Sequence, residues 1–259
     1  MSAVEEMVPQ GEVEGTTILP ILPLRETVVF PSSMTPLAIG QERSIRLVDE
    51  AVADDRTIAL VTARSVDEEA ESAEDLYGVG TSAVVHKMIR VPDGTLRILV
   101  QGLERVHLDS VEETDPYLTG LFTAMPDTVL REREAEALRR SVESLFGRII
   151  SLAPYLPEEL ELAAANADTP GALANLIAST IRLKTEEKQA LLEAADVGER
   201  LRRLTVILSR ELEVFELSLD SLGGSRCCGG ASGHLVTPGQ RRRAVSWLGR
   251  RYRLDQVSP

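Results

Sequence analysis

The dominant hydrophobic period of the chain changes after Pro126. Before this residue the apolar runs are short, and residues 96–101 alternate with a period of two. After it, apolar residues recur at intervals of three and four, first across residues 138–152. A period of two is that of a strand with one buried face, and a period near 3.6 is that of an amphipathic helix. The sequence therefore predicts an α+β protein, with a curved and mostly antiparallel β-rich part followed by a helical bundle.

The β-rich part is predicted over residues 18–126. Prolines in its first two apolar runs suit edge strands and bends, because proline cannot donate to a central ladder. Pro92-Asp93-Gly94 between two β-rich runs is typical of a hairpin turn, and Gly102 is predicted to mark a bulge. The expected elements, in order, are strands at 18–24 and 34–39 with a turn at 31–33 between them, a helix at 45–55, a strand at 57–63, the two hairpin strands, and a strand at 117–125.

The helical bundle is predicted over residues 127–220. Asp127 is expected to cap its first helix, and Thr169 with Pro170 to start another. Asp196 with Glu199 forms a variant of the capping box before the last helix. The apolar stripe of that last helix includes Leu201, Leu204, Leu208, Leu212, Phe215 and Leu219.

Both ends of the chain differ in composition from the rest. Residues 1–17 are acidic and poor in apolar side chains, so they are predicted to be a disordered leader. Residues 221–259 hold seven arginines and one acidic residue, together with both cysteines, Cys227 and Cys228, and the only tryptophan. This segment is predicted to be disordered, leaving the stripe at Phe215 and Leu219 partly exposed and the chain prone to self-association. A frameshifted end and a genuine basic tail both remain open.

Composition restricts the partners and the compartment. A net charge of −13 argues against a general binder of nucleic acid or of anionic membranes, since phosphate binding needs clustered cations. No apolar stretch approaches the length of a membrane span, and residues 1–220 contain no cysteine. The sequence therefore predicts a cytoplasmic protein with no membrane partner, for which nucleic acid is an unlikely ligand.

No constellation of catalytic or metal-binding residues survives inspection. A phosphate-binding P-loop needs a glycine directly before its lysine, but Lys87, Lys184 and Lys188 follow other residues. His86 and His107 are predicted to be ordinary sheet histidines, because no further ligands lie nearby in the sequence. The chain by itself is expected to be no enzyme and to hold no cofactor or metal.

Four separated stretches carry a family resemblance: LPLRETVVFPSSMTPLAIGQERSIRLVDEAV, DLYGVGTSAVV, RVPDGTLRILVQGLERV and DTPGALANLIA. In this order they resemble the amino-terminal, substrate-binding domain of bacterial Lon-type ATP-dependent proteases. The likeness covers residues 18 to about 220, with Gln41 standing where the family commonly has Arg. It implies a PUA-like β-domain followed by a helical bundle. Beyond residue 220 the likeness ends before the family's ATPase and protease modules, so the chain is expected to be truncated.

The resemblance also implies a role in protein quality control and proteolysis. The expected function is capture of unfolded or damaged polypeptides, with other Lon subunits as further partners in a homo-oligomer. A stand-alone adaptor or regulator with the same domain is an alternative. A PUA-like RNA-binding protein is another, against which the acidic composition argues. The sequence identifies neither the client nor the oligomeric state.

Four residues near the predicted hairpin tip and the second strand are the candidate substrate contacts. They are Pro36, Met88, Ile89 and Val91. Residues at a hairpin tip tend to be exposed, and apolar side chains there would offer a surface to an unfolded chain. The alternative is that they pack on a neighbouring strand.

Overall fold

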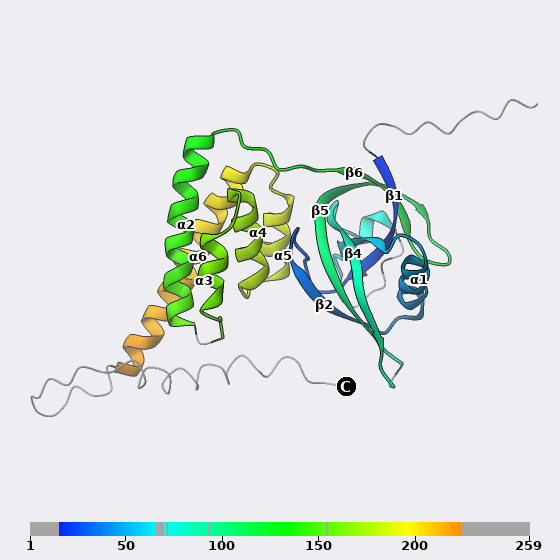
Figure 1. Ribbon diagram of the computed structural model, residues 1–259, viewed down its shortest axis with the longest axis horizontal. Coiled ribbons are helices and arrows are strands. Elements are labelled where there is room, and N and C mark those ends of the chain that lie inside the picture. The colour runs from blue at the N-terminus through cyan, green and yellow to red at the C-terminus, as the bar shows by residue number, and fades with distance from the viewer. Residues whose placement is uncertain (1–15, 66–69, 71, 93, 154, 224–259) are drawn as a thin grey trace, which may run out of the picture. The chain divides into compact units, whose positions relative to one another are not determined.

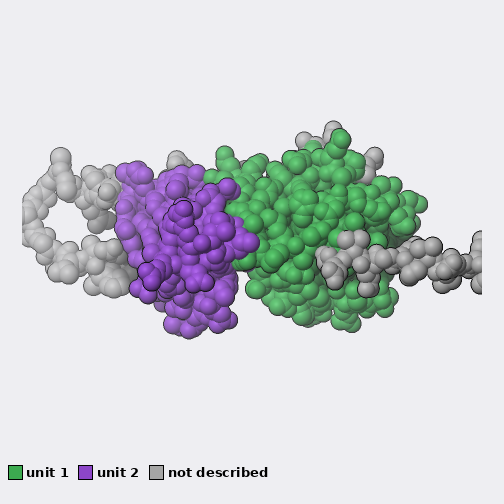
Figure 2. All heavy atoms as spheres, turned by 90° about the horizontal axis from the view of Figure 1, so that it is seen from above, with its two compact units in different colours: residues 1–127, 178–195 green, residues 128–177, 196–259 purple. Residues whose placement is uncertain are grey.

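The computed structural model describes residues 16–65, 70, 72–92, 94–153 and 155–223 (Figure 1). The chain divides into two compact units, which are coloured in Figure 2. Unit 1 comprises residues 1–127 and 178–195, and unit 2 comprises residues 128–177 and 196–259. The predicted leader, apart from Thr16 and Thr17, and the predicted tail beyond Gly223 lie outside the described residues.

Unit 1 is built on a mixed sheet of six strands. Most predicted elements occur within two residues of their expected bounds. The elements are β1 (Thr16–Leu24), β2 (Met34–Ile39), α1 (Glu42–Ala53), β3 (Thr57–Thr62), the short 3-10 helix η1 (Ala73–Asp75), β4 (Val79–Arg90), β5 (Leu96–Glu113) and β6 (Thr119–Ala124).

The strand order is β2-β5-β4-β3-β1-β6, and β6 also pairs with β5, so that five strands close a ring. Every pairing among these six strands is antiparallel except that of β1 with β3. The two strands on either side of the turn at 31–33 do not pair with each other: β2 pairs with the first half of β5 instead. β2 is therefore an extra strand outside the ring, with one neighbour in the sheet.

β5 serves two parts of the sheet because it bends at Gly102. Its pairing with β4 is irregular there, since Ala83 lies opposite Gly102 whereas Thr81 lies opposite Arg105. A Cβ at Gly102 would lie 2.3 Å from the carbonyl oxygen of Phe30, so only glycine fits this close approach. The bulge predicted at this glycine is confirmed.

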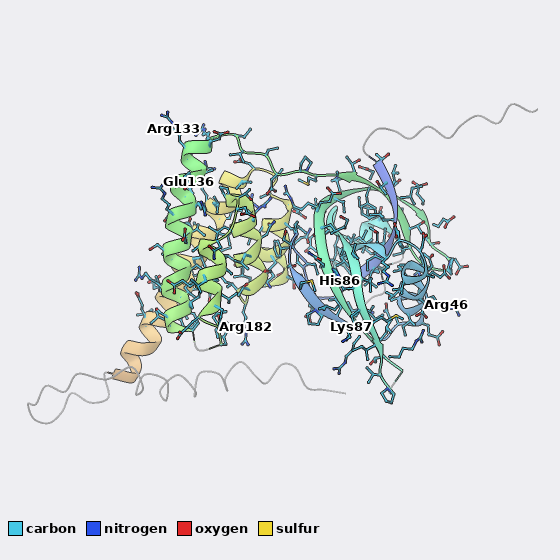
Figure 3. The ribbon with its side chains drawn as sticks, viewed as in Figure 1. Arg46, His86, Lys87, Arg133, Glu136 and Arg182 are labelled. Carbon is cyan, nitrogen blue, oxygen red and sulfur yellow. The ribbon has the colours of Figure 1, made fainter. Side chains whose placement is uncertain are left out.

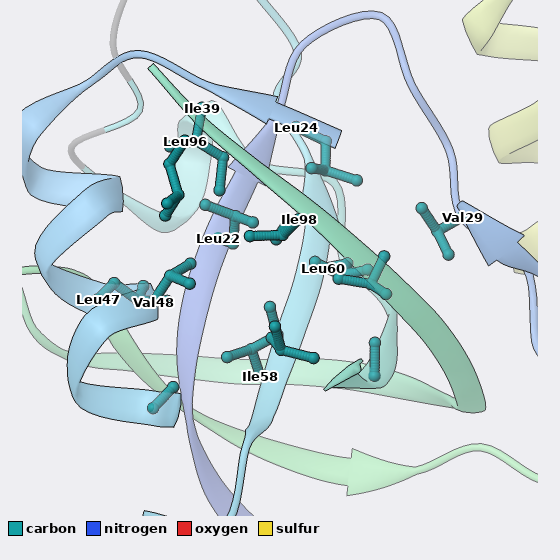
Figure 4. Packing of buried hydrophobic residues seen from close by; sticks show 14 residues of the cluster. Leu22, Leu24, Val29, Ile39, Leu47, Val48, Ile58, Leu60, Leu96 and Ile98 are labelled. Carbon is teal, nitrogen blue, oxygen red and sulfur yellow. The ribbon is translucent and has the colours of Figure 1, made fainter. Parts of the chain in front are cut away.

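The main core of unit 1 lies between α1 and the sheet (Figure 4). Leu47 and Val48 of α1 are at most 1% exposed, and they meet strand residues such as Leu22 and Ile58. Aliphatic side chains form nearly all of this cluster, as the 3% aromatic content requires. The predicted helix at 45–55 corresponds to α1, which begins three residues earlier.

A segment from the predicted bundle belongs to unit 1. It contains α5 (Thr185–Glu193), and buried Arg105 of β5 donates to the carbonyl oxygens of Leu192 and Ala194 at 3.1 and 2.9 Å. The same guanidinium forms an ion pair of 2.6 Å with Asp127. Asp127 therefore serves as the partner of a buried cation, and its predicted capping role is wrong: the first helix begins at Glu132.

Unit 2 is helical, as the change of period predicts. Its elements are α2 (Glu132–Leu152), α3 (Glu159–Ala165), α4 (Pro170–Thr180), whose last three residues group with unit 1, and α6 (Val197–Gly223). Thr169 accepts a hydrogen bond from the Ala172 amide at 3.1 Å, and Asp196 accepts one from the Glu199 amide at 3.1 Å. Both predicted helix starts are confirmed.

α2 and α6 run parallel to each other. Arg202 of α6 donates to Glu134 of α2 at 2.6 Å, and Arg148 of α2 donates to Glu216 of α6 at 2.7 Å. From the first pair to the second, the chain advances by the same number of residues in the same direction on both helices. The buried residues of α2 include Ala135, Val142 and Ile149, which recur at the heptad spacing of packed parallel helices. Within the stripe of α6, Leu208 is buried and Phe215 is half-buried.

Candidate functional site

Three neighbouring strands of unit 1 present an exposed side that we call the outer face. Cross-strand partners place their side chains on the same side of a sheet, so the register defines its members. They are Met34, Pro36 and Ala38 of β2, Arg97, Leu99 and Gln101 of β5, and Val84, Lys87 and Ile89 of β4, with the exposed side chain of His86 beside them. The opposite side of the same strands faces the core.

A bulge in β4 determines which of its residues reach the outer face. Val85 lies opposite Val100 and Lys87 lies opposite Leu99, so His86 is an extra residue in the strand. His86 and Lys87 are both exposed. Beyond them, even-numbered residues of β4 lie on the core side and odd-numbered residues on the outer face, the reverse of the order before the bulge. Because of this shift, Met88 lies on the core side and Ile89 lies on the outer face.

The outer face is unusually apolar for an exposed surface. Met34 and Ile89 are 52% and 51% exposed, although both side chains are large and hydrophobic. Pro36 and Ala38 are also exposed, and Leu99 is half-buried between their strand and β4. An apolar surface held on regular strands is a fixed platform that another polypeptide can cover.

Polar groups on and beside the outer face are arranged unequally. The ring of His86 lies 2.6 Å from the side-chain oxygen of Gln101 through its Nε2 atom, and Figure 3 shows His86 and Lys87 along β4. At the hairpin end of β4, Arg90 donates to both carboxylate oxygens of Asp49 of α1, at 2.7 and 2.5 Å. Lys87 and Arg97 are exposed.

Displaced pKa values in unit 1 occur on other surfaces. The Thr123 hydroxyl donates to Asp109 at 2.6 Å and lowers the pKa of that carboxyl. The hydrogen bond of Tyr117 to Glu50 raises the pKa of the phenol, and burial lowers the pKa of Lys188 in α5. None of these three groups is a member of the outer face.

Comparison with protein families gives one match over most of the chain. Residues 18–210 match the family model described as the ATP-dependent protease La (LON) substrate-binding domain. The chain belongs to the Lon substrate-binding domain family. The resemblance stated from the sequence motifs is thereby confirmed, and so is the α+β fold.

Curated relatives of this family share substantial identity with the chain. A Lon protease of Dictyoglomus thermophilum is 41% identical over 201 residues, which are 78% of this chain and 25% of that protein. A Lon protease of Xanthomonas oryzae pv. oryzae is 42% identical over 200 residues, or 77% of this chain and 24% of that protein. The chain thus spans about a quarter of the length of the curated relatives it matches.

Two solved structures share the fold. The N-terminal domain of Mycobacterium avium complex Lon protease has a TM-score of 0.62 at 23% identity, covering 74% of this chain and 98% of the other. A Lon N-terminal domain protein from Xanthomonas campestris has a TM-score of 0.51 at 19% identity, with coverages of 73% and 98%. At these identities the likeness concerns the fold alone.

The four sequence-based candidate contacts do not form one cluster. Pro36 and Ile89 share the outer face, one on each side of β5. Met88 lies opposite Ile98 and packs against the core cluster. Val91 is half-buried at the hairpin, where its backbone exchanges hydrogen bonds with the turn that closes at Thr95. Substrate contact by any of the four stays a prediction.

Several members of the outer face escaped the sequence analysis. Met34, Leu99, Lys87 and Arg97 were not singled out as candidates, although they flank Pro36 and Ile89 in the register. The alternation of residues 96–101 already placed Arg97 and Leu99 on the side away from the core. What the sequence could not supply was the pairing of β2 with β5, which joins Met34 to this surface.

Other kinds of site find little support in the described part of the chain. No group of three or more His, Cys, Asp or Glu among these residues could hold a metal ion. Within the same residues, no helix has the length and apolar character needed to cross a membrane. Cys227, Cys228 and His234 lie outside the described residues.

Proposed function

We propose that this chain captures unfolded or damaged polypeptides and that the outer face of β2, β5 and β4 is the surface that binds them. The observation that carries the proposal is the pair of half-exposed apolar side chains, Met34 and Ile89, on either side of Leu99 in a domain of the Lon substrate-binding family. Unfolded chains differ from folded ones by their exposed apolar segments, so an apolar surface on a fixed sheet discriminates between them.

Regular strands suit this task because they hold the contact side chains in place before the client arrives. Ile89 and Pro36 are each fixed by a ladder of backbone hydrogen bonds to β5. Less ordering entropy is then lost on binding than with contacts carried by a loop. Met88 packs against the core cluster beneath these contacts and supports the platform from that side.

The test is binding of a permanently unfolded protein, such as reduced and carboxymethylated lactalbumin, followed by biolayer interferometry. The variant Ile89→Ser combined with Pro36→Ser is expected to weaken binding by about fivefold or more, the effect of losing contacts worth over about 1 kcal/mol. Ile18→Ser is the matched control, because Ile18 is 63% exposed on β1, outside the outer face. Equal binding by the double variant and the control would reject this surface.

We further propose that the chain alone neither hydrolyses ATP nor cleaves peptide bonds. None of its three lysines follows a glycine, as a Walker A loop requires. The relatives named Lon protease are about four times as long as the stretch that they share with this chain. Cleavage of casein by a preparation that remains active through successive purification steps would contradict the proposal.

A further inference from the structure

The outer face combines apolar and cationic side chains in an alternating pattern. In one cross-strand row Lys87 lies beside Leu99, and Leu99 lies beside Pro36. In the next row Arg97 lies between two apolar residues, Ile89 and Ala38. Each cation therefore has an apolar side chain beside it on a neighbouring strand, at the distance at which cross-strand neighbours normally interact.

Both cations are among the arginines and lysines of unit 1 whose side chains have no partner in the described part of the chain. The side chains of Lys87 and Arg97 form no hydrogen bond or ion pair with any other described residue, whereas the side chain of nearby Arg90 is bound to Asp49. None of the nine outer-face positions is an Asp or Glu. This local excess of positive charge occurs on a chain with a net charge of −13, so it is not a consequence of overall composition.

From this juxtaposition we infer that the outer face prefers extended segments in which apolar residues flank acidic ones, with the client's carboxylates paired to Lys87 and Arg97. The inference rests on the proposed function, since it specifies the class of polypeptide that the same surface captures. Apolar side chains of the client cover Ile89, Leu99 and Pro36, and its acidic side chains meet the cations between them.

The spacing of the cations narrows the pattern. Arg97 lies opposite Ile89, two residues along β4 from Lys87, so the two cations are diagonal neighbours. Diagonal positions in a sheet are about 7–8 Å apart. In an extended peptide, residues i and i+2 point to the same side about 6.6–6.8 Å apart. The matching client therefore carries two acidic residues, at i and i+2. Apolar residues flank this pair at i−2 and i+4.

The experiment compares three fluorescein-labelled peptides that differ only at the two central positions. All have leucine at positions i−2 and i+4 and serine at the positions between. The pair at i and i+2 is Glu, Gln or Lys. Anisotropy titrations use the full chain at low and at physiological salt. The Glu peptide is expected to bind about two- to thirtyfold more tightly than the Gln peptide, the effect of two exposed ion pairs, and the Lys peptide more weakly than either. Salt should reduce these differences.

Charge reversal on the protein supplies the decisive variant. Lys87→Glu with Arg97→Glu should invert the order of the Glu and Lys peptides while leaving the Gln peptide almost unchanged. Arg46→Glu is the matched control, because Arg46 is an exposed cation of the same unit on α1 (Figure 3). It should preserve the wild-type order.

The outcomes separate this inference from the proposed function. Equal affinity for all three peptides, with binding still sensitive to Ile89→Ser, overturns the charge preference and leaves capture intact. Failure to bind any peptide or the unfolded protein overturns both. Equal affinity for the three peptides, together with direct binding of transfer RNA at physiological salt that is lost on charge reversal, would assign the cations to nucleic acid and also overturn the inference.

Discussion

The two sides of the β2-β5-β4 sheet both carry large apolar side chains, but in opposite environments. On the core side, Ile98 is 2% exposed and Met88 packs against the cluster beneath α1. On the outer face, Ile89 and Met34 are more than half exposed. Neither hydrophobicity nor position in the sequence distinguishes Met88 from Ile89, which are adjacent. The two residues differ in the side of the sheet on which they lie, and the bulge at His86 determines which residue lies on which side.

This contrast predicts that stability and capture depend on separate residues of the same strands. A core residue contributes through the area it buries and the cavity its removal would leave. An exposed residue of the outer face loses little by truncation in the free protein, but it matters once a client covers it. Substitutions on the two sides should therefore change different measurements.

The largest expected effect is on the core side, at Ile98. Ile98→Ala removes a buried side chain that lies between Met88 and Leu37 in the register, and it should lower the free energy of unfolding by about 2–5 kcal/mol. Urea denaturation followed by circular dichroism measures this loss. The control is Leu99→Ala on the adjacent outward position, with an expected loss below about 1.5 kcal/mol. Equal losses would mean that the two sides are not distinct.

An intermediate effect is expected from the adjacent pair on β4. Met88→Ser places a hydroxyl on the core side and should cost about 1–3 kcal/mol of stability. Ile89→Ser should change the same free energy by no more than about 0.5 kcal/mol, because the side chain is already half exposed. Thermal melts of the two single variants make the comparison. A larger loss for Ile89→Ser than for Met88→Ser would mean that Ile89, and not Met88, lies on the core side of the sheet.

Much of this architecture follows from local sequence signals. The Pro92-to-Gly94 turn, the alternation after it and the bulge glycine at 102 identify the β4–β5 hairpin, since each depends on residues close in the chain. The helix starts at Thr169 and Asp196 were equally predictable, because capping side chains bond amides three residues away.

The features that sequence did not reveal depend on long-range contacts. No local pattern announces that His86 is an extra residue, because the bulge exists only relative to the register of β5. Arg105 reads as one more exposed charge, yet it is 2% exposed and holds carbonyls of residues far along the chain. That contact places α5 with unit 1 and removes Asp127 from its expected cap. Of the four candidate contacts, only Pro36 and Ile89 share the outer face, because the pairing of β2 with β5 and the bulge at His86 depend on residues far apart in the chain.

The smallest expected change in stability concerns the edge of the sheet rather than either side. β2 has a sheet neighbour only in β5 among the described strands, and an exposed strand edge can pair with another chain. Pro36, at the centre of β2, has no N–H group and so interrupts the donors along that outer edge. The surface can then be open to clients across its face while strand-to-strand association along its edge is disfavoured.

Pro36→Thr restores a donor at this position and tests whether the proline protects the edge. The free energy of unfolding should change by no more than about 0.5 kcal/mol, since threonine suits a strand and the core side is untouched. Self-association should increase, and sedimentation velocity over a range of protein concentrations measures it. Pro31→Thr is the control, because Pro31 lies in the turn before β2 and in no strand. If both variants sediment as the parent chain does, Pro36 does not protect the edge, and its contribution is confined to the outer face.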